Sequence, residues 1–217
     1  MPLHVLGISM SPRPTSNSDI LLAEALHGAQ GDGATTDHLR LRDLNLAPCR
    51  ACEACAKTGR CIVKDDFQAV REQLLRADRL VVATPVHFMG PAAIGKALID
   101  RCQSLWSRKY RLKEPLFPGE EPDRRALVIA VGGSKVKGMF DGIRLIMTYW
   151  LDSLAMDYVA NLFVRCVDAP GAVRDDATIM GEACRLGAAL ADVDAVLPPE
   201  PTEVVLTGHD PGAATGG

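Results

Sequence analysis

The sequence predicts an α/β fold in which helices cover both faces of a parallel β-sheet. Three observations support this fold class. Apolar runs that are typical of strands alternate along the chain with segments of helical periodicity. The central runs are almost continuously apolar, as strands buried on both faces are. Proline or glycine follows several of these runs, and both residues commonly end a strand.

Five strands are expected from these runs. The second is partly polar, which suits the edge of a sheet, whereas the third and fourth (RLVVAT and ALVIAV) are almost entirely apolar. Pro85 is expected to stop the third strand, and a pair of glycines follows the fourth. The expected strands cover residues 3–9, 35–41, 79–84, 126–131 and 158–167.

Five helices are expected between and after the strands. Each carries apolar side chains three or four residues apart, which form one stripe on a helix; Phe67, Val70 and Leu74 are an example. A segment rich in charge and proline, 107–125, predicts an exposed loop. The expected helices cover residues 17–30, 66–76, 92–105, 141–155 and 173–193.

This order of elements matches a flavodoxin-like, doubly wound parallel five-stranded sheet of order 2-1-3-4-5. We expect one domain over residues 1–197, with a cysteine-rich segment at 48–64 after the second strand. Proline and glycine dominate residues 198–217, which predicts a flexible C-terminal tail. Sheets of this kind bind ligands beyond the carboxyl ends of their strands, where the strand order reverses.

Composition excludes several classes of function. Lysine and arginine total 24 and aspartate and glutamate 27, so the 217-residue chain has a net charge of −3. A nucleic-acid-binding protein usually carries a basic surplus instead. No apolar run approaches the roughly 18 residues that indicate a membrane span. A strand pattern begins directly after the N-terminal Met-Pro, which leaves no targeting peptide. A cytoplasmic protein is therefore expected.

The most specific motif is a group of four cysteines within thirteen residues. Cys49, Cys52, Cys55 and Cys61 are spaced C-x2-C-x2-C-x5-C. Three thiolates on one tight loop, with a fourth close behind, are the arrangement that holds an iron–sulfur cluster in bacterial ferredoxins. The motif therefore predicts a metal site that transfers single electrons.

Two alternatives to an iron–sulfur cluster remain open. Zinc also takes four thiolates, although structural zinc sites usually pair two separate knuckles across a longer spacer. Disulfides are a further option for a chain with seven cysteines, but they are unstable in a reducing cytosol.

Three loops at the carboxyl ends of the strands are candidates for a ligand site. The loop 9–18 is rich in hydroxyl groups, carries Arg13 and opens onto a helix, so it suits either a phosphate or ordinary helix capping. The loop 84–91 is stiffened by two prolines, and its His87 and Phe88 could cover a planar ring or merely form a turn. The glycine-rich loop 132–138 permits close approach by a ligand or forms a surface loop.

Taken together, these motifs resemble the iron–sulfur flavoprotein branch of the NADPH-dependent FMN reductase family. The resemblance spans roughly residues 3–195 and rests on the serine-rich loop, the cysteine stretch through Lys64-Asp65-Asp66, Thr84-Pro85-Val86, the segment 96–101 (KALIDR) and Val131-Gly132-Gly133. It implies FMN, a 4Fe–4S cluster on the four cysteines, NAD(P)H as a possible electron donor, and a homodimer or homotetramer.

The resemblance also implies which residues bind the cofactors. The FMN phosphate loop corresponds to Ser9, Ser11, Arg13, Ser16, Asn17 and Ser18. The loop beside the flavin ring corresponds to Pro85, Val86, His87, Phe88 and Met89, and a third contact to Gly132 and Gly133. The four cysteines hold the cluster. No side-chain acid or base is expected to be catalytic, because hydride and electrons pass directly to and from the ring.

The predicted function is an oxidoreductase that passes electrons from NAD(P)H or ferredoxin to a quinone, to oxygen or peroxide, or to a redox protein. One alternative is a plain NAD(P)H-dependent FMN or quinone reductase without a cluster. Another is a zinc-binding or redox-sensing interaction module on a flavodoxin-like scaffold, since this fold serves many functions.

Overall fold

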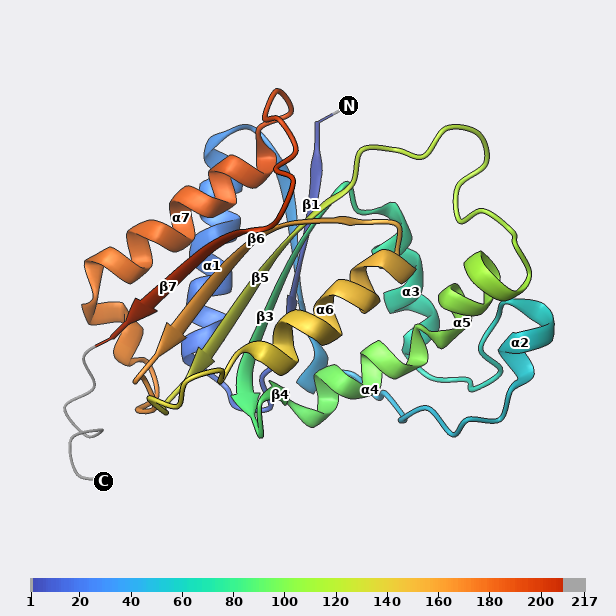
Figure 1. Ribbon diagram of the computed structural model, residues 1–217, viewed down its shortest axis with the longest axis horizontal. Helices are drawn as coiled ribbons and strands as arrows, with labels where there is room; N and C mark the ends of the chain where they lie inside the picture. The colour runs from blue at the N-terminus through green and yellow to red at the C-terminus, as the bar shows by residue number, and fades with distance from the viewer. Residues whose placement is uncertain (1, 209–217) are drawn as a thin grey trace.

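Figure 1 shows the computed structural model, which describes residues 2–208. Six parallel strands form the sheet in the order β2-β1-β3-β5-β6-β7, and a short strand, β4, pairs antiparallel with β3. The predicted order of five strands is confirmed, and a sixth parallel strand extends the sheet beyond β6. The strands are β1 (His4–Ser9), β2 (Thr35–Arg40), β3 (Arg79–His87), β4 (Gly90–Pro91), β5 (Arg125–Gly132), β6 (Asp157–Arg165) and β7 (Thr202–Thr207).

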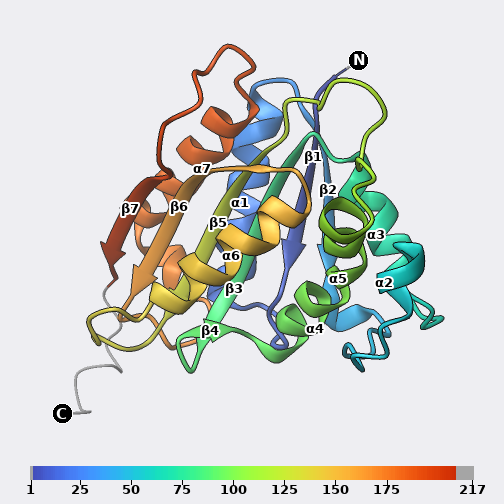
Figure 2. The same ribbon diagram turned by 45° about the vertical axis from the view of Figure 1, so that its right-hand side comes forward.

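Helices cover both faces of the sheet, as Figures 1 and 2 show. One face carries α1 (Asn17–Gly31) and α7 (Ala177–Ala191). The other carries α3 (Phe67–Arg76), α4 (Ala93–Arg101), α5 (Gln103–Trp106) and α6 (Asp141–Ser153). The short helix α2 (Ala54–Thr58) lies within the cysteine segment. Single turns of other helix types cover Leu41–Asp43, Ser107–Arg111 and Ala172–Asp175.

The alternation of side chains along each strand divides the interior into two cores. In β3, Leu80 and Val82 pack with α3 to α6, whereas Val81 and Ala83 pack with α1 and α7. All four are fully buried. Successive strand residues point to opposite faces, so a strand covered on both faces must be apolar at every position. This explains the continuous apolar runs.

The third strand does not end at Thr84 as expected. It continues through Pro85, which pairs with Val131 of β5, and reaches His87 before the chain turns back as β4. Proline fits an extended backbone and only removes one donor, so it need not end a strand. The expected helix 92–105 is likewise divided, because α4 ends at Arg101 and α5 begins at Gln103.

The prediction of a flexible tail from residue 198 is wrong for residues 202–207, which form β7. This strand pairs with β6 from Ala160↔Thr202 to Arg165↔Thr207. The glycines and prolines around it obscured the alternating run TEVVLT, whose Val204 and Leu206 pack against the core shared with α7. The sheet domain therefore extends past residue 197, and the rest of the predicted tail, 209–217, lies outside the described residues.

Over residues 2–208, no helix combines the length and the apolarity that a bilayer span requires.

Candidate cofactor sites

The loop after β1 leads directly into the first turn of α1. Ser16 is the N-cap: its Oγ accepts a hydrogen bond from the Asp19 N–H at 3.1 Å. The Ser11 Oγ accepts from the Arg13 N–H at 3.2 Å and donates to the Arg13 carbonyl at 3.3 Å, which folds the loop back on itself. The loop thus caps the helix and also presents its free N-terminal end, where anions bind.

Two of the predicted phosphate-loop residues also make hydrogen bonds that hold the scaffold. The Ser9 Oγ donates to the carboxylate of Asp19, which also accepts from Arg42 Nη1 at 2.6 Å. Asn17 donates through Nδ2 to the Ala169 carbonyl at 2.9 Å and accepts from the Val173 N–H at 3.3 Å. These bonds fix α1 against β1 and against the loop that follows β6.

Segments at the ends of four strands, β1, β3, β5 and β6, meet around a cavity of about 140 Å³ at the carboxyl edge of the sheet. It is lined by most of the residues that the sequence singled out. Ser9, Phe88 and Met89 are not among them, whereas Asp168 and Pro170 in the loop after β6 are additional. These two residues could have been predicted from the sequence, because they follow the end of a strand, where such sheets bind ligands. The predicted residues in the lining are Ser11, Arg13, Ser16, Asn17, Ser18, Pro85, Val86, His87, Gly132 and Gly133.

The two predicted residues Phe88 and Met89 form the tip of the β3–β4 hairpin. Phe88 is fully exposed, and both have positive φ angles of 49° and 64°. A two-residue turn of this kind normally uses asparagine and glycine, and a side chain with positive φ costs about 1–3 kcal/mol. Such strain is concentrated at functional sites, so the hairpin tip remains a candidate for contact with a ligand above the cavity.

Gly132 and Gly133 allow close packing within the protein. A Cβ at Gly132 would lie 2.7 Å from Met139 Sδ, and one at Gly133 would lie 2.9 Å from the Asp168 Cβ. The missing side chains therefore bring the loops after β5 and β6 together and narrow this end of the cavity.

A second and larger cavity, of about 790 Å³, lies beside α4, α5 and α6. All four cysteines of the C-x2-C-x2-C-x5-C motif line it. Cys49 and Cys52 are exposed, and Cys55 and Cys61 are half-buried. The backbone of this segment turns sharply at Ala51, Glu53 and Gly59, which all have positive φ angles. Figure 2 shows the segment around α2 standing out from the sheet next to α5.

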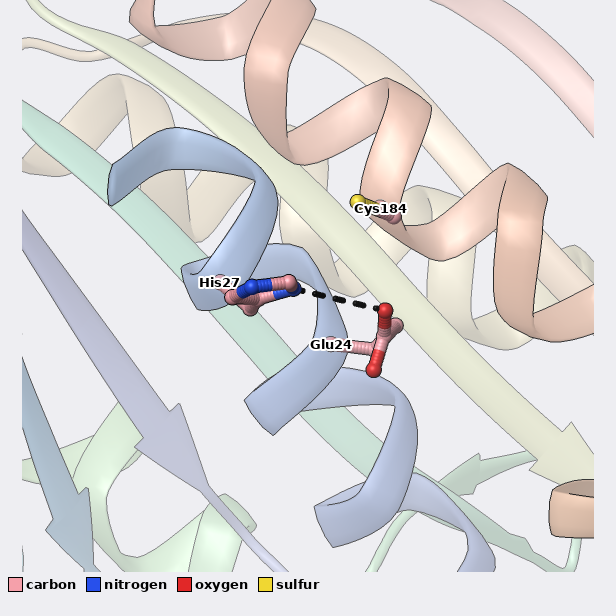
Figure 3. A group of neighbouring side chains, drawn as sticks. All are labelled: Glu24, His27 and Cys184. Carbon is pink, nitrogen blue, oxygen red and sulfur yellow. Dashed lines mark ion pairs between the residues drawn. The ribbon is translucent and has the colours of Figure 1, made fainter. Parts of the chain in front are cut away.

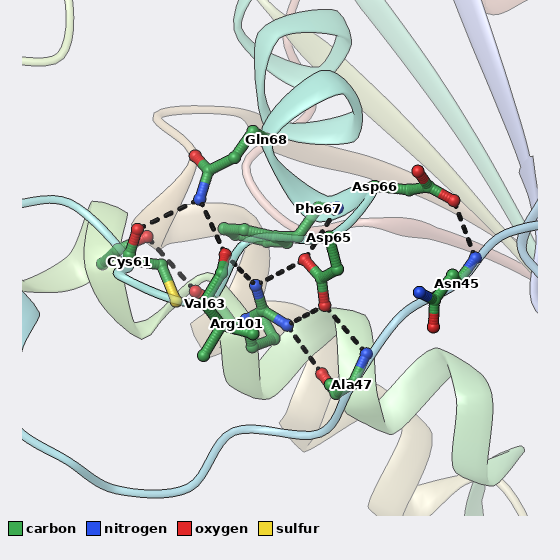
Figure 4. A network of polar contacts seen from close by, with 10 residues as sticks. Asn45, Ala47, Cys61, Val63, Asp65, Asp66, Phe67, Gln68 and Arg101 are labelled. Carbon is green, nitrogen blue, oxygen red and sulfur yellow. Dashed lines mark hydrogen bonds and ion pairs between the residues drawn. The ribbon is translucent and has the colours of Figure 1, made fainter.

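A buried arginine closes the base of the cysteine segment (Figure 4). Arg101 Nη1 donates to the Ala47 carbonyl at 2.7 Å and to Asp65 Oδ2 at 2.6 Å, and Nη2 donates to Asp65 Oδ1 at 2.8 Å. The side chains of Arg101 and Asp65 are only 1% and 4% exposed. Ala47 precedes the first cysteine and Asp65 follows the last, so one guanidinium group fastens both ends of the segment.

The same contacts shift the ionisation of this pair. The hydrogen bond from Arg101 is the main reason that the pKa of Asp65 lies below its usual value. The hydrogen bond to Asp65 raises the pKa of Arg101, and the neighbouring Cys61 sulfur raises it further. The guanidinium carbon also lies 4.5 Å from the centre of the Phe67 ring.

The donors around the larger cavity fit an anionic group. Arg101 Nε and Trp150 Nε1 are buried N–H groups that make no hydrogen bond of good geometry, and both residues line the cavity. Their neighbours include the Cys61 sulfur for Arg101 and the Cys102 sulfur for Trp150. Arg50 and Arg111 add positive charge, whereas Lys96 pairs with Asp100 of the same lining and Glu53 adds a negative charge. A cluster bound by four thiolates carries negative charge and accepts hydrogen bonds at sulfur. The cysteine cavity therefore has the donor groups that such a cluster requires.

Within residues 2–208, no three of the four cysteine sulfur atoms lie within 4.8 Å of one another. A tetrahedral zinc ion with bonds of about 2.3 Å holds its sulfur ligands about 3.8 Å apart. In the described residues the four sulfur atoms are therefore not held at the spacing of a bound zinc ion.

The β3–β4 hairpin connects the two cavities. His87 lines the smaller one. On the other strand of the hairpin Gly90 pairs with His87, and a Cβ at Gly90 would lie 3.9 Å from Ile146 Cδ1 of α6, a residue that lines the cysteine cavity. The start of α6 also packs closely against the hairpin tip, because a Cβ at Gly142 would lie 2.3 Å from the Met89 carbonyl oxygen.

The chain is similar to several known proteins. The sequence model of the NADPH-dependent FMN reductase family matches residues 3–157. An iron–sulfur flavoprotein of Methanocaldococcus jannaschii is 33% identical over 149 residues, which cover 69% of this chain and 72% of that protein. An iron–sulfur flavoprotein of Archaeoglobus fulgidus is 34% identical over 147 residues, or 68% and 71% of the two chains.

A solved structure supports the fold. An NAD(P)H:quinone oxidoreductase from Methanothermobacter marburgensis superposes with a TM-score of 0.70 at 20% identity, over 90% of this chain and 100% of that one.

Proposed function

The chain belongs to the iron–sulfur flavoprotein branch of the NADPH-dependent FMN reductase family, and from that premise we propose that it carries both FMN and a 4Fe–4S cluster. Membership in this family makes it a flavin-dependent oxidoreductase. FMN accepts a hydride and an iron–sulfur cluster carries single electrons, so together they join two-electron donors to one-electron acceptors. NAD(P)H or ferredoxin is the proposed donor, and a quinone, oxygen, peroxide or a redox protein is the proposed acceptor.

The observation that carries the proposal is the position of the two cavities on either side of one hairpin. His87 belongs to the lining of one cavity, and Gly90 packs against Ile146 in the lining of the other. Electron transfer between two cofactors requires that they lie near each other within a protein or an assembly. This arrangement, together with the buried N–H donors of Arg101 and Trp150, supports a cluster more than a vestigial cysteine segment.

In the proposed flavin site, Ser11, Arg13, Ser16 and Ser18 hold the phosphate. Arg13 supplies a charge-assisted bond, and the N-terminal end of α1 supplies free N–H groups. Ser9 and Asn17 position this loop through their bonds to Asp19 and to the loop after β6. Residues 85–89 and the Gly132–Gly133 pair lie beside the ring, with Phe88 and Met89 reaching it from the hairpin tip.

In the proposed cluster site, Cys49, Cys52, Cys55 and Cys61 are the four ligands. Arg101 and Trp150 donate hydrogen bonds to sulfur, which is one of the means by which a protein tunes the potential of a cluster. A homodimer or homotetramer and a cytoplasmic location remain predictions, of which the first is tested by sedimentation of the anaerobic protein.

Anaerobic purification tests the proposal directly. The expected protein is brown, with about four irons and one FMN per chain. A yellow protein without iron would favour the plain reductase, and a colourless protein with zinc on the four cysteines would favour the interaction module.

Single substitutions test the ligand sets. Cys52→Ala is expected to remove iron and leave FMN bound, because Cys52 is exposed and lines only the cysteine cavity. Cys184→Ser, outside that cavity, is the matched control.

Arg13→Ala is expected to weaken FMN binding about tenfold or more through the lost charged hydrogen bond, with Arg40→Ala as control. Unchanged iron in Cys52→Ala, or an unchanged dissociation constant in Arg13→Ala, would reject the corresponding assignment.

A further inference from the structure

Three metal-binding side chains gather between α1 and α7 (Figure 3). These two helices cover the face of the sheet opposite the helices that line the cysteine cavity. Glu24 and His27 lie one turn apart on α1, and Cys184 lies on α7. A ligand atom of each lies within 4.8 Å of the other two. His27 Nδ1 and Glu24 Oε1 are 3.6 Å apart.

The two helices that carry these side chains are locked together by backbone contact. A Cβ at Gly28 would lie 2.0 Å from the Cys184 carbonyl oxygen, and one at Gly187 would lie 1.8 Å from the Ala25 carbonyl oxygen. Each contact lies within a few residues of the three side chains. The helix backbones therefore cannot drift apart, and a metal ion would not have to bring distant elements together.

The donor atoms define the class of metal. One thiolate, one imidazole and one carboxylate form a ligand set that zinc accepts, whereas magnesium and calcium prefer oxygen ligands alone. Zinc bonds of about 2.0–2.3 Å place neighbouring donors about 3.3–3.8 Å apart. The 3.6 Å between His27 and Glu24 already matches this spacing, and the Cys184 sulfur lies within 4.8 Å of both. His27 is 74% exposed at its side chain and Glu24 is 30% exposed, so both can rotate toward the sulfur.

We propose that Glu24, His27 and Cys184 form a zinc site that joins the first and last helices of the domain, with water as the fourth ligand. Binding requires the thiolate of Cys184 and the neutral imidazole of His27, so it releases the thiol proton and weakens as the pH falls. Zinc that binds only the folded chain also raises its stability. This site shares no residue with the proposed flavin and cluster sites.

The test uses anaerobic, cluster-loaded protein, in which the four motif cysteines are already occupied. Zinc is titrated in competition with a colorimetric chelator, and iron and zinc are measured in the same sample. Wild type is expected to take up one zinc per chain and to melt at a higher temperature in its presence. Cys184→Ser and His27→Ala are expected to weaken zinc binding at least tenfold, whereas the control His4→Ala is expected to bind as wild type does.

X-ray absorption at the zinc edge identifies the ligands. One sulfur with nitrogen and oxygen neighbours supports the site, whereas a shell of four sulfurs would place the zinc on the motif cysteines and overturn it. Equal zinc affinity in wild type and Cys184→Ser, or no uptake at all, would also overturn it. If the protein proves to lack an iron–sulfur cluster, the difference of one zinc between wild type and Cys184→Ser still decides the question.

Discussion

At the scale of single residues, Arg101 ties both ends of the cysteine segment together. Its guanidinium group bonds a carbonyl before the first cysteine and a carboxylate after the last one, and it lies over the Phe67 ring. Bidentate contacts of this kind fix the orientation of the two side chains and also pair their charges. Arg101 is thus a positioning residue for the proposed cluster ligands, in particular for the neighbouring Cys61.

Replacing Arg101 with glutamine is expected to lower the free energy of unfolding by about 3 kcal/mol, because the buried carboxylate of Asp65 loses its partner. Iron per folded chain, measured after anaerobic purification, is also expected to fall. Arg101→Lys should recover part of the iron, since lysine keeps the charge and loses the bidentate contact.

Arg79 offers a matched control for this substitution. It is also 1% exposed and bonds Asp123, but it lies outside the lining of the cysteine cavity. Arg79→Gln should destabilise the protein and leave the iron content of folded chains at the wild-type level. Equal iron in Arg101→Gln and wild type would show that Arg101 supports the fold without positioning the ligands.

The Asp65–Arg101 pair also predicts a dependence of stability on pH. The folded pKa of Asp65 lies below its ordinary value of 3.8, so the carboxylate stabilises the folded state fully above the unfolded pKa. That contribution is lost as the pH falls through the lower, folded pKa. Urea unfolding of wild type and Asp65→Asn, followed by circular dichroism, should therefore differ most above about pH 4 and converge in stronger acid. A difference that does not change with pH would contradict this assignment.

At the scale of elements, the contact of α1 with α7 depends on two glycines. Gly28 and Gly187 each face a backbone carbonyl of the other helix at a distance that leaves no room for a methyl group. The approach fixes how α1, whose N-terminal end forms the phosphate loop, lies against the sheet. Packing at one end of the helix thus determines the placement of the loop at its other end.

Gly187→Ala is expected to destabilise the protein by about 1–3 kcal/mol or more, because its Cβ would overlap the Ala25 carbonyl oxygen and force the helices apart. Gly181→Ala, on the same helix with nothing within 4 Å of the added methyl group, is the control. It should stabilise the protein by about 0.5–1 kcal/mol through helix propensity. Urea denaturation measures both, and similar effects of the two substitutions would contradict the close contact.

At the scale of the whole molecule, β7 completes the sheet. It covers the edge of β6 along six paired residues, and Glu203 on it forms two bonds of 2.6 and 2.8 Å with Arg144 of α6. An uncovered β6 would present its backbone groups to solvent and to other chains. The C-terminal strand is therefore part of the domain that carries the sites.

A chain that ends at residue 197 is expected to lose at least about 2 kcal/mol of stability, from the lost strand pairing and ion pair, and to aggregate. A chain that ends at Gly208 keeps β7 and should match the full-length protein in thermal unfolding and light scattering. Equal stability of the 197-residue chain and the full-length protein would mean that β7 adds nothing to the fold.

Much of the fold and of the candidate site followed from local patterns. The continuous apolar runs predicted β1, β3, β5 and β6, because a strand buried on both faces is apolar at every position. The cysteine spacing identified its own segment, and the strand-end rule brought ten predicted residues to one cavity. The family resemblance inferred from these motifs is confirmed by the comparisons.

The tertiary structure alone decided which of these residues act together. Ser9 does not line the cavity and bonds Asp19 instead. Arg101 bonds Ala47 and Asp65, which lie 54 and 36 positions away in the sequence. Cys184 of α7 lies near His27 of α1. Nothing local marks such partners, because each contact depends on how distant elements pack. Periodicity and spacing fix what a segment forms, whereas close packing between segments fixes what its side chains touch.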